Sequence, residues 1–225
     1  MWRKISGGAI ALFSLLLAGP VVAGCAGAWL VATRLPLGPF AGVAGLLAGY
    51  IVFFCATVLV YRVFFALRPL PEGAIEADAP EAFVCDIYFL FYLLVFYPVT
   101  FCRSIPLPIL RVVYLMLGAK LGKNTYCSGV IMDPLLVEAG DNTLIGLDAF
   151  VSGHAIEGDR LVLKKTRVGS RVTVGTNVVV LPGVEIGDGA LVGSNSVVAK
   201  NTRIGPGEVW AGSPARCVRR PGDTA

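Results

Sequence analysis

The sequence predicts two parts of different character: an α-helical membrane hairpin with interfacial helices, and then an all-β domain of stacked short strands. Of the 225 residues, 56% are apolar and only 15% are charged, which is too apolar for an ordinary soluble domain. Two long uncharged stretches near the N-terminus predict the hairpin. An aliphatic repeat with a six-residue period predicts the all-β part.

The membrane hairpin is predicted from two uncharged stretches, Ile5–Thr33 and Phe40–Tyr61. Each exceeds the roughly 20 residues that cross a bilayer. Basic residues lie before the first stretch and after the second, whereas the connecting turn has Arg34 alone, so the positive-inside rule places both ends in the cytoplasm. We therefore expect a multi-pass protein of the inner (cytoplasmic) membrane that contacts membrane lipids and whose C-terminal domain faces the cytoplasm.

A third apolar segment, about residues 82–102, is predicted to be an interfacial or re-entrant helix. Its uncharged part, Ile87–Cys102, has only sixteen residues and contains Pro98. A third crossing would also place the C-terminal domain outside the cell, although a true third span stays open as the alternative. Val22–Cys25 resembles a lipoprotein cleavage box, but the apolar run continues past Cys25, which disfavours that interpretation. The membrane-anchoring region is thus placed at residues 1–120.

The all-β part is predicted from aliphatic residues that recur at every sixth position. The clear track is Val168, Val174, Val180, Ile186, Val192, Val198 and Ile204, and a weaker copy is Leu121, Cys127, Asp133, Ala139, Ile145 and Val151. Five of the seven residues in the clear track precede a glycine, for which we expect a backbone conformation that a side chain would resist. Three hexads would close one coil around the aliphatic side chains. The domain is placed at residues 121–216, followed by a basic tail at 217–225.

The two tracks do not join in phase, because Val151 and Val168 are seventeen residues apart instead of eighteen. Residues 153–160 lack the pattern, so a loop must leave the coil there. Loops that project from a rigid scaffold often carry the functional residues.

Three motifs carry a resemblance to a known family: Val180–Asp188, Val192–Lys200 and the closing Trp210–Arg216. With these motifs the sequence resembles the hexapeptide-repeat acyltransferases, a superfamily with a left-handed parallel β-helix that includes serine, maltose, galactoside and xenobiotic acetyltransferases. The resemblance implies a left-handed coil, a homotrimer and acetyl-CoA or another acyl-CoA as donor substrate. It also implies acyl transfer to a hydroxyl or amine, and the apolar N-terminal half suggests a lipid-linked, membrane-associated or saccharide acceptor.

His154 is the candidate general base and the only histidine in the chain. In the family, a histidine at the base of an excursion from the coil has this role, and transfer from a thioester needs a base that works near pH 7. The other imidazole nitrogen should be held by a carboxylate, for which the candidates are Asp133, Glu138, Asp148 and Glu157. Asp133 is favoured because it replaces an aliphatic residue at an inward hexad position, where an isolated charge is costly.

The donor site is also implied by the resemblance. The family threads the pantetheine arm of CoA between adjacent β-helices of a trimer. Carried over to this sequence, the donor-binding residues are Gly193, Ser194, Lys200, Gly212, Ser213 and Arg216. Ammonium and guanidinium groups suit the phosphates of CoA.

Several other functions are disfavoured by composition. The γ-class carbonic anhydrases share this coil but need three histidines, and the six cysteines form no CxxC pair, so we expect no metal. Sugar nucleotidyltransferases with a β-helical tail need a phosphate-binding loop that is not present in the sequence. The net charge of +4 lies mostly beside the apolar segments and in the tail, which indicates lipid headgroups and not nucleic acid. The alternative that remains is a non-catalytic β-helical membrane scaffold or interaction protein.

Overall fold

The computed structural model describes residues 4–102 and 104–223. It divides the chain into two compact units. We call them the helical unit, which comprises Lys4–Leu70 and Phe83–Tyr92, and the β-helix unit, which comprises Pro71–Ala82 and the chain from Leu93 onward.

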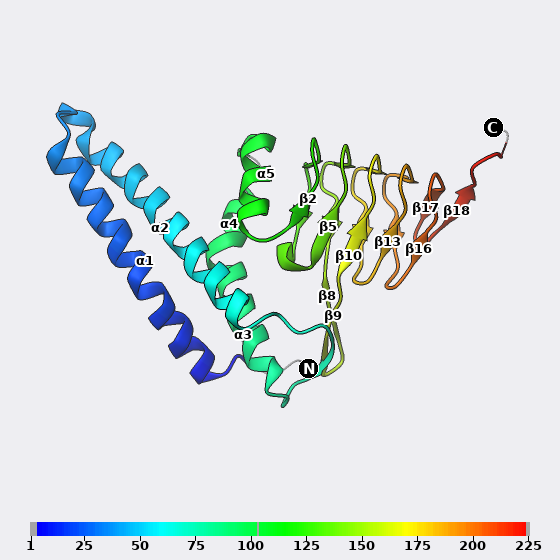
Figure 1. The fold of residues 1–225 in the computed structure, drawn as a ribbon, viewed down its shortest axis with the longest axis horizontal. Coiled ribbons are helices and arrows are strands. Elements are labelled where there is room, and N and C mark those ends of the chain that lie inside the picture. The colour runs from blue at the N-terminus through cyan, green and yellow to red at the C-terminus, as the bar shows by residue number, and fades with distance from the viewer. Residues whose placement is uncertain (1–3, 103, 224–225) are drawn as a thin grey trace. The chain divides into compact units, whose positions relative to one another are not determined.

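The helical unit is built on a hairpin of two long helices. Helix α1 (Gly7–Arg34) and helix α2 (Ala41–Leu67) are joined by the 3-10 turn η1 (Gly38–Phe40) (Figure 1). Glycine lets the two helices approach closely, because a Cβ built on Gly49 would lie only 2.7 Å from the Cβ of Ala28. Large apolar side chains such as Leu46, which is 73% exposed, lie on the surface of this unit. The predicted apolar N-terminal helices are confirmed.

Within residues 4–102 and 104–223, three helices are long and apolar enough to cross a membrane: Gly7–Arg34, Gly38–Leu67 and Glu81–Thr100. These helices are consistent with membrane association. The third consists of α3 (Glu81–Phe91), the π-helical turn η2 (Tyr92–Phe96) and α4 (Tyr97–Thr100). The wide turn precedes Pro98, which lacks an N–H group and clashes with the carbonyl four residues earlier. The 20 residues of the third helix, Glu81–Thr100, are also long enough to span a membrane. The interfacial placement of this helix therefore stays a prediction.

The β-helix unit is a stack of coils in which short parallel strands form three faces. Face 1 contains β2 (Lys120–Leu121), β5 (Val137–Ala139), β10 (Thr166–Val168), β13 (Glu185–Ile186) and β16 (Arg203–Ile204). Face 2 contains β3 (Tyr126–Cys127), β6 (Leu144–Ile145), β11 (Thr173–Val174), β14 (Leu191–Val192), β17 (Val209–Gly212) and the antiparallel β18 (Ala215–Arg219). Face 3 contains β4 (Val130–Ile131), β7 (Phe150–Val151), β12 (Val179–Val180) and β15 (Val197–Val198). The chain runs from face 1 to face 2 to face 3 in each coil.

The core of this unit is the interior of the coils. Val174 pairs with Val192 and Val180 with Val198, each eighteen residues further on, and all four side chains are fully buried. The period of six therefore corresponds to one inward aliphatic side chain per face. The predicted hexapeptide-repeat parallel β-helix is confirmed, and its left-handedness stays a prediction.

The glycines of the repeat have a different role from the predicted one. The left-handed backbone conformation falls three residues after the inward aliphatic, at Asn177 (φ +57°), Gly183 (φ +76°) and Asn195 (φ +59°). The glycine directly after the aliphatic is needed for space, because a Cβ on Gly175 would lie 2.7 Å from the amide nitrogen of Ser194 in the next coil. The expectation of an unusual backbone conformation at these glycines was wrong.

Chain segments before residue 121 also belong to the β-helix unit. Helix α5 (Leu107–Met116) contributes Leu110 and Tyr114 to the coil core, and the amide of Ile131 donates a hydrogen bond to the hydroxyl of Tyr114 at 3.1 Å. An open coil end exposes apolar side chains, which this helix covers. Strand β1 (Gly73–Glu76) joins the same unit, so the compact units divide the chain differently from the predicted boundary at residue 120.

Candidate active site

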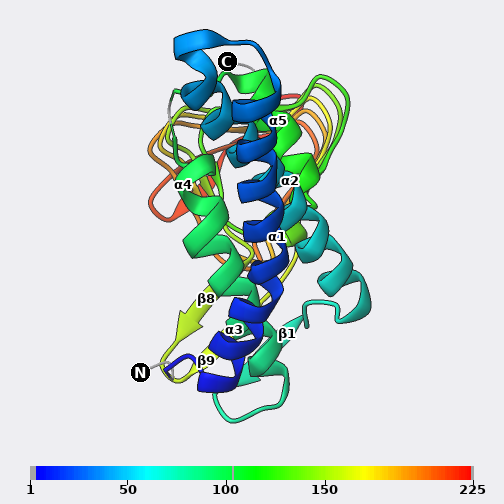
Figure 2. The ribbon, with the colours of Figure 1, turned by 90° about the vertical axis from the view of Figure 1, so that its left-hand side faces the viewer.

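The interruption of the repeat is a β-hairpin. Val151 pairs with Val180, twenty-nine residues on, which is the usual eighteen plus eleven inserted residues. The insertion forms β8 (His154–Glu157) and β9 (Arg160–Leu163), with Gly158 (φ +65°) in the tight turn. It leaves the coil at the corner between faces 3 and 1. Figure 1 and Figure 2 both show it projecting from the stacked coils.

Asp133 lies at the same corner, one coil earlier. The inward position predicted for it is occupied by Ile131, which pairs with Val151. The chain takes only four residues from Cys127 to Ile131 and then eight to Ala139, with the 3-10 turn η3 (Pro134–Leu136) in the longer part. The predicted inward hexad position of Asp133 was therefore wrong. Its carboxylate is instead fully buried beside the root of the hairpin.

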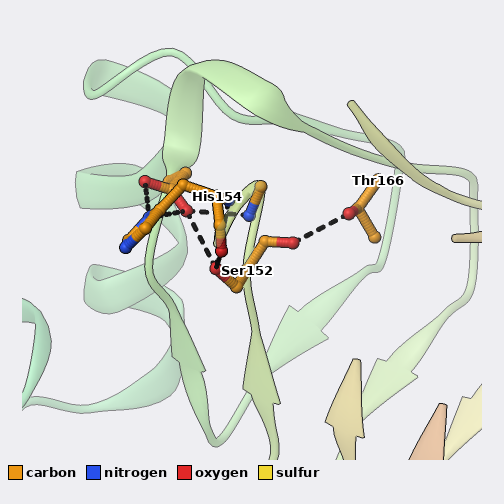
Figure 3. Close-up of polar contacts among 5 residues, drawn as sticks. Ser152, His154 and Thr166 are labelled. Carbon is orange, nitrogen blue, oxygen red and sulfur yellow. Dashed lines mark hydrogen bonds and ion pairs between the residues drawn. The ribbon is translucent and has the colours of Figure 1, made fainter. Parts of the chain in front are cut away.

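The centre of the site is a contact between His154 and Asp133. The imidazole Nδ1 lies 2.8 Å from both carboxylate oxygens of Asp133. The Asp133 side chain is 1% exposed and the His154 side chain 17% exposed. Figure 3 shows one ring nitrogen turned into this cluster and the other pointing away from the residues drawn.

The backbone around Ser152 and Gly153 fixes the carboxylate. The Gly153 amide donates to Asp133 Oδ2 at 2.7 Å, and the Ser152 hydroxyl lies 3.2 Å from the same oxygen. A Cβ on Gly153 would lie 2.9 Å from Cδ1 of Leu136, so only glycine lets the strand come this close. Thr166 in turn donates its hydroxyl to the carbonyl of Ser152 at 2.9 Å (Figure 3).

These contacts set the protonation behaviour of His154. Burial disfavours the charged imidazolium and on its own would lower the pKa of His154, but the hydrogen bond to Asp133 and the charge of that carboxylate outweigh burial and raise the pKa. A carboxylate only accepts, so in the neutral ring the proton sits on Nδ1 and the lone pair on Nε2. The arrangement can therefore take a proton from a group placed at Nε2.

The other three carboxylates proposed to orient His154 lie elsewhere in the fold. Glu138 points outward on face 1, where the hydrogen bond from Lys120 at 2.8 Å lowers the pKa of its carboxyl. Asp148 is a turn residue (φ +56°) at the corner between faces 2 and 3. Glu157 lies at the hairpin tip, where its carboxylate pairs with Lys200.

The residues proposed to bind the donor fall at two places. Gly193, Ser194, Gly212 and Ser213 lie together, since the hydroxyl of Ser196 donates to the Gly193 carbonyl at 2.6 Å and accepts from the Gly212 amide at 3.1 Å. Arg216 is in the neighbouring strand β18. Lys200 lies at the corner between faces 3 and 1, paired with the hairpin.

The sequence did not predict that Ser152 and Thr166 lie in the hydrogen-bonded cluster at the hairpin root. Ser152 lies directly before Gly153, and Thr166 lies where the repeat resumes. These two polar residues only weakly indicate that the root of the hairpin is polar. Among the residues that the structure describes, no group of three or more His, Cys, Asp or Glu side chains is placed to hold a metal ion.

The β-helix unit is thus a coil of hexapeptide repeats with a hairpin whose root places an imidazole on a buried carboxylate. Residues 165–200 match the family described as bacterial transferase hexapeptide (six repeats). The predicted resemblance to hexapeptide-repeat transferases is thereby confirmed.

Individual proteins and structures are similar over parts of the chain. Delta-poly-L-ornithine synthetase of Acinetobacter baumannii is 35% identical over 103 residues, which are 44% of this chain and 8% of that protein, so the chain spans less than a tenth of this relative. A hexapeptide-repeat acetyltransferase of Vibrio cholerae, solved with acetyl-CoA, has a TM-score of 0.51 and 22% identity over 61% of this chain and 90% of its own. A galactoside acetyltransferase in complex with coenzyme A is 32% identical, with a TM-score of 0.38, over 44% of this chain and 53% of its own. The Vibrio cholerae structure shares the fold.

Proposed function

We propose that the protein is an acyl-CoA-dependent acyltransferase in which His154 is the general base and Asp133 orients it. The observation that carries this proposal is the imidazole held by a buried carboxylate at 2.8 Å, at the root of the hairpin that interrupts the coil. Such a pair fixes the tautomer of the ring and stabilises the imidazolium that forms during proton transfer. The match to the transferase family and the fold shared with an acetyltransferase that binds acetyl-CoA support the reaction class.

The reaction is a direct transfer without a covalent enzyme intermediate. Nε2 of His154 takes the proton from the hydroxyl or amine of the acceptor as that atom attacks the thioester carbonyl. The tetrahedral intermediate then collapses, the carbon–sulfur bond breaks, and the departing CoA sulfur takes the proton back from the imidazolium. Backbone amides steady the oxyanion. Proton transfer by a positioned base typically contributes about 10²- to 10⁴-fold to the rate.

The donor is acetyl-CoA or a longer acyl-CoA, bound by the cluster of Gly193, Ser194, Gly212 and Ser213 and by Arg216. The backbones of Gly193 and Gly212 both hydrogen-bond to the Ser196 hydroxyl, which holds these two segments of neighbouring coils together. Lys200 contributes less than the resemblance implied, because its ammonium is paired with Glu157.

A homotrimer is supported by the outward side chains of the coil. Face 1 carries a charged ladder, whereas faces 2 and 3 carry ladders that are mostly apolar. The face 1 ladder is Lys120, Glu138, Arg167, Glu185 and Arg203; the face 2 ladder is Tyr126, Leu144, Thr173, Leu191 and Val209; and the face 3 ladder is Val130, Phe150, Val179 and Val197. Apolar surface of this extent favours burial against another copy. We propose that faces 2 and 3 pack in the trimer, that face 1 stays in water, and that the coil is left-handed.

The acceptor is proposed to be lipid-linked, membrane-associated or a saccharide made at the inner membrane, with the β-helix unit facing the cytoplasm. The support for this step is the set of apolar helices described above. The cytoplasm is also where acyl-CoA donors are available to a membrane enzyme.

The test combines purified full-length protein with acetyl-CoA and either a membrane lipid extract or a saccharide mixture. CoA release and the mass of acylated products are followed, and the melting temperature is measured with and without acyl-CoA. The proposal expects CoA release that depends on an acceptor, a product heavier by one acyl group, and a higher melting temperature. If no donor is consumed and acyl-CoA leaves the melting temperature unchanged, the protein is a non-catalytic scaffold.

A further inference from the structure

The hairpin that carries His154 is completed by a strand from another part of the chain. A two-stranded hairpin of four residues per strand is only marginally stable by itself in water. Strand β1, from the linker between α2 and α3, pairs antiparallel with β9 and makes a three-stranded sheet of order β1-β9-β8. The linker therefore covers the edge of β9 that does not pair with β8.

The register of this sheet ties the linker to the histidine. Gly73 pairs with Leu163, and Leu163 pairs with His154, so the row of residues that begins in the linker ends at the proposed base. At the root, the amide of Lys164 donates to the carbonyl of Gly153 at 2.8 Å and continues the pairing into the coil. A change in the pairing of β1 thus acts on the strand that sets the backbone of His154.

Burial shows that this side of the sheet is packed along β1 and β9, whereas Ile156 of β8 is 56% exposed. Residues directly opposite one another in a sheet share a face, and so do alternate residues along a strand. Ile75, Leu161 and Leu163 therefore lie on the same face as His154, and all three are buried, at 5%, 0% and 0% exposure. The linker supplies one of the three apolar side chains that anchor this face.

Ion pairs fasten the linker at both ends of its strand. Glu72 pairs with Lys165 at 2.6 Å beside the hairpin root, and Glu76 pairs with Arg160 at 2.7 Å beside its tip. Exposed pairs of this kind add little to stability, but here they select one lateral position of the linker on the hairpin. Glu76 and Arg160 are also register partners, so their opposite charges disfavour a shifted register.

We propose that strand β1 is a positioning element for His154: the linker holds the hairpin in the register that keeps the imidazole on Asp133. This inference deepens the proposed function and rests on it for its catalytic consequence, whereas the positioning itself can be measured without activity.

The test uses the fact that His154 is the only histidine, so a protein labelled with isotopic histidine gives a single imidazole signal. In full-length protein, Glu76→Arg places two guanidinium groups opposite each other and weakens the pairing of β1. The double variant E76R/R160E restores opposite charges. Lys120→Glu reverses a charge in an exposed pair on face 1, with a 2.8 Å contact to Glu138, and is the matched control.

We expect the E76R variant to lower the imidazole pKa towards its ordinary value and to lower kcat about two- to five-fold, with the KM for acyl-CoA unchanged. The double variant should return both quantities to wild type, and the control should leave both unchanged. An imidazole signal and a kcat that do not respond to E76R, or that the double variant fails to restore, would overturn the proposal. If the imidazole responds as expected but no variant and no wild type consumes acyl-CoA, positioning stands and the proposed acyltransferase function fails.

Discussion

The substitution Asp133→Asn probes the link between the buried carboxylate and the proposed base. In the wild type, Asp133 Oδ2 accepts from the Gly153 amide at 2.7 Å, and both oxygens lie 2.8 Å from Nδ1 of His154. In the variant, the amide oxygen must stay on the Gly153 side to accept that N–H. The new NH₂ group then faces Nδ1, and because it can only donate, it favours the tautomer with the proton on Nε2, where a base is needed.

The expected magnitude follows from the charge-assisted hydrogen bond that is lost. Hydrogen bonds to charged groups contribute about 1.5–3 kcal/mol, and about 1.4 kcal/mol corresponds to a ten-fold change in rate. We therefore expect kcat to fall about 10- to 100-fold, with little change in the KM for acyl-CoA. The pKa of His154 should also fall, because Asp133 is what raises it.

The assay is CoA release at saturating donor and acceptor, together with a titration of the single imidazole signal. Glu138→Gln is the matched control, since this carboxylate lies outward on face 1 and pairs with Lys120. The control should keep the wild-type kcat. A D133N variant that keeps kcat within two-fold of wild type, with an unchanged imidazole pKa, would refute the orienting role of Asp133.

Four further outcomes can be measured. Because the pKa of His154 is raised in the unliganded protein, the acidic limb of the pH profile of kcat/KM should lie above the ordinary histidine value of about 6.5, and a limb at or below 6.5 contradicts this. The stability that the pair contributes should be present below about pH 6.5 and lost as the pH rises through the folded-state pKa. In the coil core, Ile145→Ala should cost about 2–5 kcal/mol in denaturant unfolding and Ile145→Val about 0.5–1.5 kcal/mol, since the side chain is fully buried; equal costs would argue against tight packing. Gly175→Ala should cost about 1–3 kcal/mol because its methyl group meets the Ser194 amide, and a neutral result would mean that neighbouring coils can move apart. Leu191→Asp should lower the mass of the oligomer seen by native mass spectrometry, and an unchanged mass would exclude face 2 from the trimer interface.

The coil could be predicted from the sequence because its cause is local and repeated. One inward aliphatic side chain is required per face, so the period of six appears directly in the sequence. The reason for the glycines could not be read in the same way. The close approach of Gly175 to the next coil depends on a residue eighteen or more positions away, and a sequence pattern gives no distance between coils.

The site could be predicted in part. His154 was proposed as the base because it is the only histidine in the sequence and lies where the repeat is interrupted. The predicted contact between Asp133 and His154 is present, but the predicted hexad position of Asp133 was wrong. The spacings of four and eight residues around Ile131 add up to the same twelve as two hexads, so the sequence does not reveal the shift. The strand β1 had no local signal, since a four-residue strand that pairs with a distant hairpin is defined only by tertiary contacts.

The most direct measurement compares CoA release by the wild type and by His154→Ala, at donor concentrations that saturate both proteins. If His154 is the base that activates the acceptor, the variant should bind acyl-CoA with wild-type affinity and lose about 10²- to 10⁴-fold in turnover. Full turnover in the variant, with the same product, would contradict that assignment.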